Sequence, residues 1–225
     1  MTGFRVDFDV EPLILYERDH LIAVNKPPWI PSTGRTLDDP ECLQHKLIAR
    51  NRGKMIWAVH QLDALTSGVN LFVARKSLVA VMTERLKRFG TKRYVAVCHG
   101  APDLDRQRVD VPLGWVQALG RRGVTEEGQR AVSDVTVLSR AADAALIEVV
   151  LHTGRTHQIR IHMAHLGHPL FGEARYRDPA SEGHARNALH AASLSFKDDQ
   201  TRIEAPLPDD LRELAGRLGL DVGGL

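Results

Sequence analysis

One acidic residue stands in a short segment whose residue types suit a catalytic loop. Residues 60–68 read His-Gln-Leu-Asp-Ala-Leu-Thr-Ser-Gly, so Asp63 follows a buried-looking strand and precedes hydroxyl side chains and a glycine. Loops held by a rigid sheet are where catalytic groups usually lie, and a carboxylate there can act as a nucleophile or a base. The alternative is an Asx-turn, in which Asp63 only accepts hydrogen bonds from backbone amides.

A second segment gathers cationic side chains around an expected strand-to-helix turn. Residues 151–162 read Leu-His-Thr-Gly-Arg-Thr-His-Gln-Ile-Arg-Ile-His, with two arginines and three histidines. A guanidinium from this turn could pair with the carboxylate of Asp63 and keep it ionised, while the helix N-terminus offers amides to a phosphate. The alternative is that Arg155 and Arg160 are surface residues with solvated head groups.

An aromatic residue and a basic run precede that segment. Tyr94 follows a basic stretch on an expected strand, where its ring could stack on a nucleobase or simply pack as a half-buried strand tyrosine. The run itself, residues 84–93, is the best candidate for an RNA-facing patch, although solvated helix faces often look the same. It holds one acid, Glu84, against the cations Arg85, Lys87, Arg88, Lys92 and Arg93.

The histidines near the second segment raise the alternative of a metal-dependent hydrolase. His157, His162, His165 and His168 have helical spacing. However, the sequence holds no His-Glu-x-x-His motif, no cysteine accompanies the group, and His168 lies past the expected end of the helix. We therefore expect no metal site, and histidines that pack, cap or contact RNA.

The composition indicates a globular protein. The 225 residues are 43% hydrophobic and 26% charged, without a linker or repeat, so one domain is expected over residues 1–225. The net charge is only +2, so a nucleic-acid partner would need a local basic surface. Cys42 and Cys98 cannot form a disulfide framework, which favours the cytoplasm. No apolar run approaches the roughly 18 residues of a membrane span, and a monomer is the default.

Strand and helix patterns alternate irregularly along the chain. The expected strands are residues 13–16, 21–25, 69–74, 93–99, 132–138, 146–151, 189–196 and 201–205, and the expected helices are 41–52, 77–89, 157–166 and 209–218. Ser77 is expected to cap the second helix and Gly90 to end it. Without a strict βαβ rhythm, the pattern predicts an α+β fold with a mixed, largely antiparallel sheet.

Taken together, these segments resemble the RluA family of RNA pseudouridine synthases. The family motif His-Arg-Leu-Asp-x-x-Thr-Ser-Gly is matched by residues 60–68, and the other motifs follow in the family's order across most of the chain. These are Val-Asn-Lys-Pro at 24–27, Lys-Arg-Tyr-Val-Ala at 92–96, Gly-Arg-Thr-His-Gln-Ile-Arg at 154–160, Gly-His-Pro-Leu-Phe-Gly at 167–172 and Leu-His-Ala at 189–191. Several ordered motifs are far more specific than one.

The resemblance implies a pseudouridine synthase fold with flanking helices, a central RNA-binding cleft and no cofactor. By the same likeness, Asp63 is the catalytic carboxylate, Tyr94 stacks on the target base and Arg160 forms a salt bridge with the aspartate, with Arg155 as the competing choice. Leu189 would be an apolar wall. The other expected substrate contacts are His60, Gln61, Thr66, Arg155 and His157.

Two positions depart from the family pattern. Gln61 stands where the family usually has an arginine, which raises the alternative of a non-catalytic RNA-binding protein with the same fold. Trp29 follows the Asn-Lys-Pro motif where a glycine is more common. The N-terminal RNA-binding module of some members is expected to be absent, since only about a dozen residues precede the first expected strand. The RNA substrate, ribosomal or transfer RNA, is left open.

Overall fold

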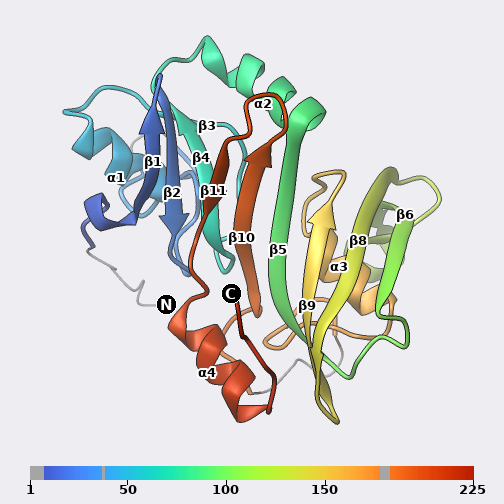
Figure 1. Ribbon diagram of the computed structural model, residues 1–225. Helices are drawn as coiled ribbons and strands as arrows, with labels where there is room; N and C mark the ends of the chain where they lie inside the picture. Colours follow the sequence, from blue (N-terminus) through green and yellow to red (C-terminus); the bar gives the residue numbers. More distant parts are fainter. Residues whose placement is uncertain (1–7, 37–38, 178–182) are drawn as a thin grey trace. The chain divides into compact units, whose positions relative to one another are not determined.

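The computed structural model describes residues 8–36, 39–177 and 183–225 (Figure 1). The chain divides into two compact units. The first unit comprises Met1–Gly90 and Ser193–Ala205, and the second comprises Thr91–Ala192 and Pro206–Leu225. Strand β10 (Leu189–Phe196) therefore begins in the second unit and ends in the first.

The first unit is an antiparallel sheet with helices on both of its faces. Strand β2 pairs with β1 and with β4, β3 pairs with β4, and β11 pairs with the end of β10. The other elements of this unit, with their bounds, are η1 (Glu11–Leu13), β1 (Ile14–Arg18), β2 (Leu21–Lys26), α1 (Leu43–Arg50), β3 (Trp57–Ala58), β4 (Ser67–Val73), α2 (Leu78–Phe89) and β11 (Arg202–Glu204).

Alternation along the strands explains the two layers of helices in this unit. Successive side chains of a strand point to opposite faces. Ile22 and Phe72 pack in the cluster that includes Leu47 of α1. Their neighbours Leu21 and Leu71 pack in the cluster that includes residues of α2. Because β4 is buried on both faces, its sequence reads as a nearly continuous apolar run.

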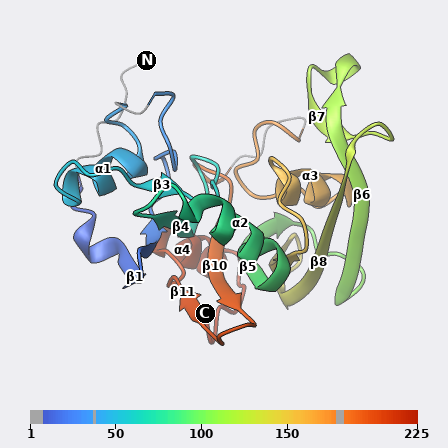
Figure 2. The ribbon, with the colours of Figure 1, turned by 90° about the horizontal axis from the view of Figure 1, so that it is seen from above.

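The second unit contains five antiparallel strands in the order β5-β9-β8-β6-β7, together with the start of β10. Figure 2 shows β6 and β7 at the edge beside α3. The elements of this unit, with their bounds, are β5 (Gly90–His99), β6 (Arg106–Val116), η2 (Gln117–Leu119), β7 (Arg121–Val124), β8 (Gln129–Arg140), β9 (Ala144–Leu151), α3 (Gln158–His165) and α4 (Asp209–Arg217).

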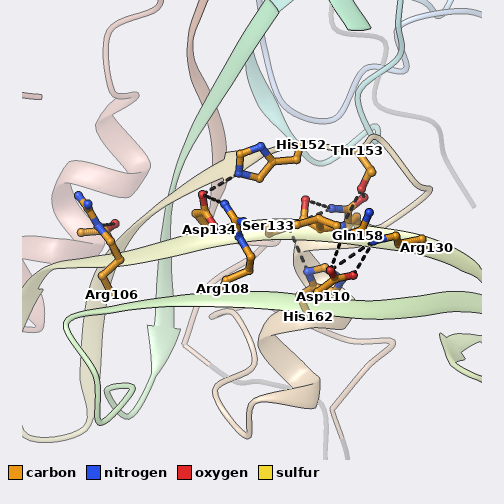
Figure 3. A network of polar contacts seen from close by, with 12 residues as sticks. Arg106, Arg108, Asp110, Arg130, Ser133, Asp134, His152, Thr153, Gln158 and His162 are labelled. Atoms are coloured by element: carbon orange, nitrogen blue, oxygen red, sulfur yellow. Dashed lines mark hydrogen bonds and ion pairs between the residues drawn. The ribbon is translucent and has the colours of Figure 1, made fainter. Parts of the chain in front are cut away.

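Helices α3 and α4 cover opposite faces of this sheet. Leu113 and Ala131 pack with Ile161 of α3. On the other face, Val95 packs in the cluster that contains Leu211 of α4. Towards the β6 edge, that second face carries ion pairs instead of a helix (Figure 3).

These ion pairs join β6 to β8, with a branch to the end of β9. Arg108 Nε lies 2.7 Å from Asp134 Oδ1, and the same carboxylate lies 2.6 Å from His152 Nε2. Arg130 Nη2 lies 2.6 Å from Asp110 Oδ2. We call these five residues the charged face of β6 and β8.

The fold class predicted from the sequence is confirmed: the chain is α+β, with largely antiparallel strand pairing. Residues 189–196 are a strand as predicted, and each predicted helix exists with ends within two residues of the prediction. The prediction for Ser77 was wrong in one respect. It stands at the N-cap of α2 in αR conformation, and its side chain makes no capping hydrogen bond.

Strands β3, β6 and β7 were missed. In β6, half-exposed polar residues and Pro112 obscure the alternation, and proline is tolerated there because most of β6 lies at a sheet edge. Among the helices of the described chain, none is long and apolar enough to cross a bilayer.

Candidate active site

The loop that carries Asp63 is fixed by hydrogen bonds to a residue distant in the sequence and by a turn of its own. The backbone N–H of Leu62 donates to Ser32 Oγ at 2.9 Å, and the Ser32 hydroxyl is 3.3 Å from the Leu62 carbonyl oxygen. Ser32 is buried, so these bonds form away from solvent. The turn after Asp63 is closed by a 2.9 Å hydrogen bond from the Thr66 N–H to the Asp63 carbonyl oxygen.

His60 and Asn70 fasten the start of the same loop to β4. Asn70 Nδ2 donates to the His60 carbonyl oxygen at 2.9 Å. The ring of His60 accepts a 3.3 Å bond at Nε2 from the backbone N–H of Leu71. His60, expected from the sequence to contact substrate, therefore has a structural contact within the first unit. Thr66 is buried, whereas Gln61 is exposed.

A fully buried lysine holds the far side of the loop. Lys26 Nζ is surrounded by three backbone carbonyl oxygens, at 2.7 Å from Ile30, 2.9 Å from Pro27 and 3.0 Å from Ala64. An ammonium has three donors, so each can meet one of these oxygens, which offsets part of the cost of burying the charge. The backbone on both sides of Asp63 is thus anchored by buried polar side chains.

In the second unit, the turn before α3 is organised by the side chain of Gln158 (Figure 3). Its Oε1 accepts from the Thr153 hydroxyl at 2.7 Å and from the Arg155 N–H at 3.0 Å. Its Nε2 donates to Val132 O at 3.0 Å and to Ser133 Oγ at 2.9 Å on β8. One buried amide therefore ties the Gly-Arg-Thr-His turn to the sheet.

Arg160 points from α3 into a buried ion pair. Its Nε is 2.7 Å from Glu173 Oε2 and its Nη2 is 2.8 Å from Oε1, a two-pronged geometry. The side chains are 9% and 0% exposed. Burial opposes ionisation of Glu173, but the hydrogen bonds and charge of Arg160 outweigh it, so its pKa lies below the ordinary value.

The loop after Gly172 wraps around that carboxylate. Glu173 Oε1 also accepts bonds from the backbone N–H groups of Arg175 at 2.8 Å and Tyr176 at 3.2 Å. Sequence reasoning missed Glu173, although it directly follows the Gly-His-Pro-Leu-Phe-Gly motif. The sequence did offer one signal for Glu173: it is an acidic residue directly after Gly172, the last residue of a family motif. Gly172 is required there because its φ is +70° and a Cβ would lie 1.9 Å from the Arg186 carbonyl oxygen.

Tyr176 connects this pair to the start of α3. Its hydroxyl lies 2.6 Å from His157 Nδ1, and the Arg160 guanidinium lies 5.2 Å from its ring centroid. A second cation, Arg121 of β7, lies 5.3 Å from the same ring. His157 has a φ of +59°, a left-handed conformation that is uncommon outside glycine but that histidine adopts more often than most residues. The second unit therefore brings His157 and Arg160 together around one aromatic ring.

The two arginines proposed as partners of Asp63 differ in setting. Arg155 is exposed and its Nε donates to the Arg130 carbonyl oxygen at 3.1 Å, so its head group lies at the surface. Arg160 is buried. This difference favours Arg160 as the arginine with a fixed orientation, although its pairing with Asp63 stays a prediction.

Tyr94 and Leu189 are both buried within strands. Tyr94 lies on β5, opposite Val149 of β9. The Leu189 carbonyl oxygen accepts a 3.0 Å bond from Arg186, which is itself 2.6 Å from Asp210 of α4. A buried arginine thus fixes the start of β10, where the apolar wall was predicted.

The predicted basic run does not form one free surface. Arg85 pairs with Asp198 at 2.7 Å and with Asp199 at 2.5 Å. Arg93 pairs with Glu148 on the neighbouring strand β9. Lys87 Nζ also lies 4.0 Å from Glu84 Oε2. Three of its cations therefore already lie beside acids, so the run as a whole is a weaker candidate for RNA contact than its composition indicated.

The histidines of the second segment have separate partners. His162 Nδ1 lies 3.0 Å from Ser133 Oγ, and His168 Nδ1 lies 3.0 Å from the carbonyl oxygen of His99. Across residues 8–36, 39–177 and 183–225, no group of three or more His, Cys, Asp or Glu side chains is arranged to hold a metal ion.

Burial of His162 predicts a loss of stability in mild acid. Burial, with a smaller contribution from His165, lowers the pKa of His162 to about 4, from 6.5. Below pH 6.5 the unfolded chain takes up a proton that the folded chain refuses until about pH 4. Stability should therefore fall by on the order of 2 kcal/mol between pH 7 and 4.5 through this residue alone.

Urea unfolding at both pH values measures this effect. His162→Asn should flatten the pH dependence, while the control His20→Asn, at an exposed position with φ +68°, should leave it unchanged. An equal pH dependence in wild type and His162→Asn would contradict the prediction. His99 also has a pKa lowered to about 4 by burial, so some dependence should remain.

Comparisons with known proteins agree on one family. A family model described as RNA pseudouridylate synthase matches residues 20–165. The uncharacterized RNA pseudouridine synthase YjbO of Bacillus subtilis is 34% identical over 211 residues, covering 89% of this chain and 74% of the relative. Ribosomal large subunit pseudouridine synthase C of Escherichia coli O157:H7 is 33% identical over 222 residues, covering 92% of this chain and 70% of the relative.

A solved structure shows the same fold. Human RNA Pseudouridylate Synthase Domain Containing 4 superposes with a TM-score of 0.79 at 23% identity, over 95% of each chain. The sequence match, the relatives and the fold agree with the RluA-like motifs read from the sequence. The chain therefore belongs to the RNA pseudouridylate synthase family, and it is an isomerase that converts uridine to pseudouridine in RNA.

Proposed function

We propose that this enzyme modifies ribosomal or transfer RNA, with Asp63 as its catalytic carboxylate. The observation that carries the assignment is the anchoring of the Asp63 loop by Lys26, Ser32 and Asn70, all buried. Catalytic groups must be held in place before the substrate arrives, because reorganisation during the reaction costs rate. Ribosomal RNA is the first substrate to test, since the Escherichia coli relative is named for the large ribosomal subunit.

The reaction breaks the bond between ribose C1′ and uracil N1, turns the base and joins C1′ to C5. The hydrogen on C5 is then lost as a proton and N1 takes up a proton, so that substrate and product are isomers. Asp63 would act as a nucleophile at the sugar or as a base on it, and both roles require the ionised form. Neither requires a metal or a redox cofactor.

The other site residues are proposed to serve the same nucleotide. Arg160 would keep Asp63 ionised and oriented, Tyr94 would stack on the target base, and Leu189 would be its apolar wall. Taking uridine out of its stack costs roughly a few kcal/mol, which such contacts must offset. The further proposed substrate contacts, in a central RNA-binding cleft, are His60, Gln61, Thr66, Arg155 and His157.

We also propose that the chain forms a single catalytic domain and acts as a monomer in the cytoplasm. The family match over residues 20–165 runs from the first unit into the second, which supports treating both as parts of one domain. Cys42 and Cys98 are buried and free, in keeping with a reducing compartment.

Tritium release from RNA labelled at C5 of uridine tests the proposal. Each pseudouridine formed expels one C5 hydrogen, so release counts turnovers. Wild type should release tritium from ribosomal or transfer RNA transcripts, and Asp63→Ala should release none from either. Release by Asp63→Ala at the wild-type rate would remove Asp63 from the chemistry. No release by wild type from either pool would contradict the proposed substrates.

A further inference from the structure

Trp29 is an exposed tryptophan in an unfavourable backbone conformation. The residue is 52% exposed, and its φ is +71°. Left-handed φ values are uncommon for residues other than glycine, and for a bulky residue they mark strain that the surrounding structure must impose. Trp29 therefore exposes apolar surface to water and holds a strained backbone conformation. Packing in the core compensates for neither cost, because the residue is largely exposed.

The segment around Trp29 is fixed on both sides. Before it, the Pro27 carbonyl oxygen is held by Lys26 Nζ at 2.9 Å. After it, the Ile30 carbonyl oxygen is held by the same ammonium at 2.7 Å, and the Pro31 carbonyl oxygen accepts a 3.0 Å bond from the backbone N–H of Leu43. The strained conformation is therefore imposed by contacts at both of its flanks.

The same ammonium group ties Trp29 to the proposed catalytic loop. Lys26 Nζ is 3.0 Å from the carbonyl oxygen of Ala64, the residue after Asp63. The buried Nζ of Lys26 therefore binds both Ile30, which follows Trp29, and Ala64, which follows Asp63. Both segments belong to the first unit, so this proximity is internal to it.

Exposure alone would not single out Trp29. Trp115 is 56% exposed, but it lies in the regular strand β6 and is absent from the residues with positive φ. Trp29 combines exposure, strain and attachment to the Asp63 loop. Within the described parts of the chain, its indole makes no contact with another aromatic ring, and about half of the residue is open to solvent.

We propose that Trp29 is a stacking platform for an unpaired nucleobase next to the target uridine. Single-stranded RNA is recognised largely by stacking of splayed bases on aromatic side chains, and every base has a face that can stack. The placement beside the target rests on the proposed catalytic role of Asp63. The platform would select RNA whose neighbouring base can leave its own stack.

The first test separates binding from strain. Trp29→Gly suits the left-handed conformation, so its melting temperature should be equal to or above that of wild type. Loss of one stacked base should raise KM for RNA by about 5- to 100-fold. Trp29→Phe keeps a ring and should recover most of the affinity. Val81→Ala, at a 58% exposed apolar position on α2, is the control and should keep the wild-type KM.

The second test uses fluorescence and does not depend on turnover. In a Trp57→Phe, Trp115→Phe background, Trp29 is the only tryptophan left of the three. Single-stranded oligoribonucleotides should quench its emission, since base stacking quenches indole, and fully paired RNA should quench it much less. Equal quenching by both, or no quenching at saturating RNA, would overturn the proposal.

The two proposals can fail separately. If Trp29→Gly melts at a lower temperature and keeps the wild-type KM, Trp29 has a structural role and the platform is refuted. If the platform tests succeed but Asp63→Asn still turns over, Trp29 remains an RNA contact while its placement beside the target is refuted with the catalytic assignment.

Discussion

Asp63→Asn is expected to lose pseudouridine formation by on the order of 10⁴-fold while RNA binding is largely retained. The amide has almost the shape of the carboxylate, but it is neutral and serves neither as a nucleophile nor as a base at neutral pH. The loop should keep its position, because Ser32 and Lys26 hold the backbone of Leu62 and Ala64 on either side of Asp63.

Single-turnover product formation and filter binding on the same RNA separate the two effects. The control is Asp19→Asn, an exposed acid in a turn with φ +50°, a conformation that asparagine tolerates. It removes the same charge and should retain full activity. If Asp63→Asn lost RNA affinity in proportion to activity, Asp63 would be a binding residue and its catalytic assignment would fall.

Glu173→Ala is expected to destabilise the protein by about 3–5 kcal/mol, because it removes a fully buried carboxylate that accepts two hydrogen bonds from the buried guanidinium of Arg160. The cost also includes the backbone N–H groups of Arg175 and Tyr176, which lose their acceptor. Since the pKa of Glu173 is lowered, the pair stabilises the fold above the ordinary pKa of 4.5 and weakens as pH falls below it.

Urea unfolding at pH 7 measures this loss, and the chain offers a matched control. Arg202 and Glu204 form an arginine–glutamate pair with side chains 60% and 57% exposed. Glu204→Ala should cost less than about 1 kcal/mol, because water already screens that pair. Similar costs for the two variants would show that burial does not set the strength of the Arg160 pair.

Most of the fold could be predicted from local patterns. The helices were found because their apolar residues repeat with helical spacing, and β10 was found to the residue because apolar residues recur along it and a polar turn follows it. Strand β6 was missed because a sheet edge need not bury alternate residues. The alternation of apolar and polar residues is weaker in edge strands, and Pro112 made a strand at residues 106–116 look less favourable.

The candidate site was predictable only where a motif lies within one segment. Asp63 and Arg160 stand in such motifs. Ser32 contacts Leu62 across 30 residues of sequence, and nothing in either segment indicates the other. Glu173 lies 13 residues after Arg160, in a loop whose path depends on Gly172. The side chains that support the motif residues are brought to them by long-range contacts of the folded chain, and local sequence spacing does not reveal those contacts.

The charged face of β6 and β8 also affects whether copies of the protein aggregate through this sheet edge. Strand β7 covers only the end of β6, and Thr125 bonds to Pro112, so residues 106–111 form a sheet edge with backbone groups that another strand could pair with. Arginine and aspartate side chains line that edge, and a second copy docking there would have to strip water from them. We therefore expect concentrated solutions to resist edge-to-edge aggregation, and charge-removing changes on β6 to lower solubility before they lower activity.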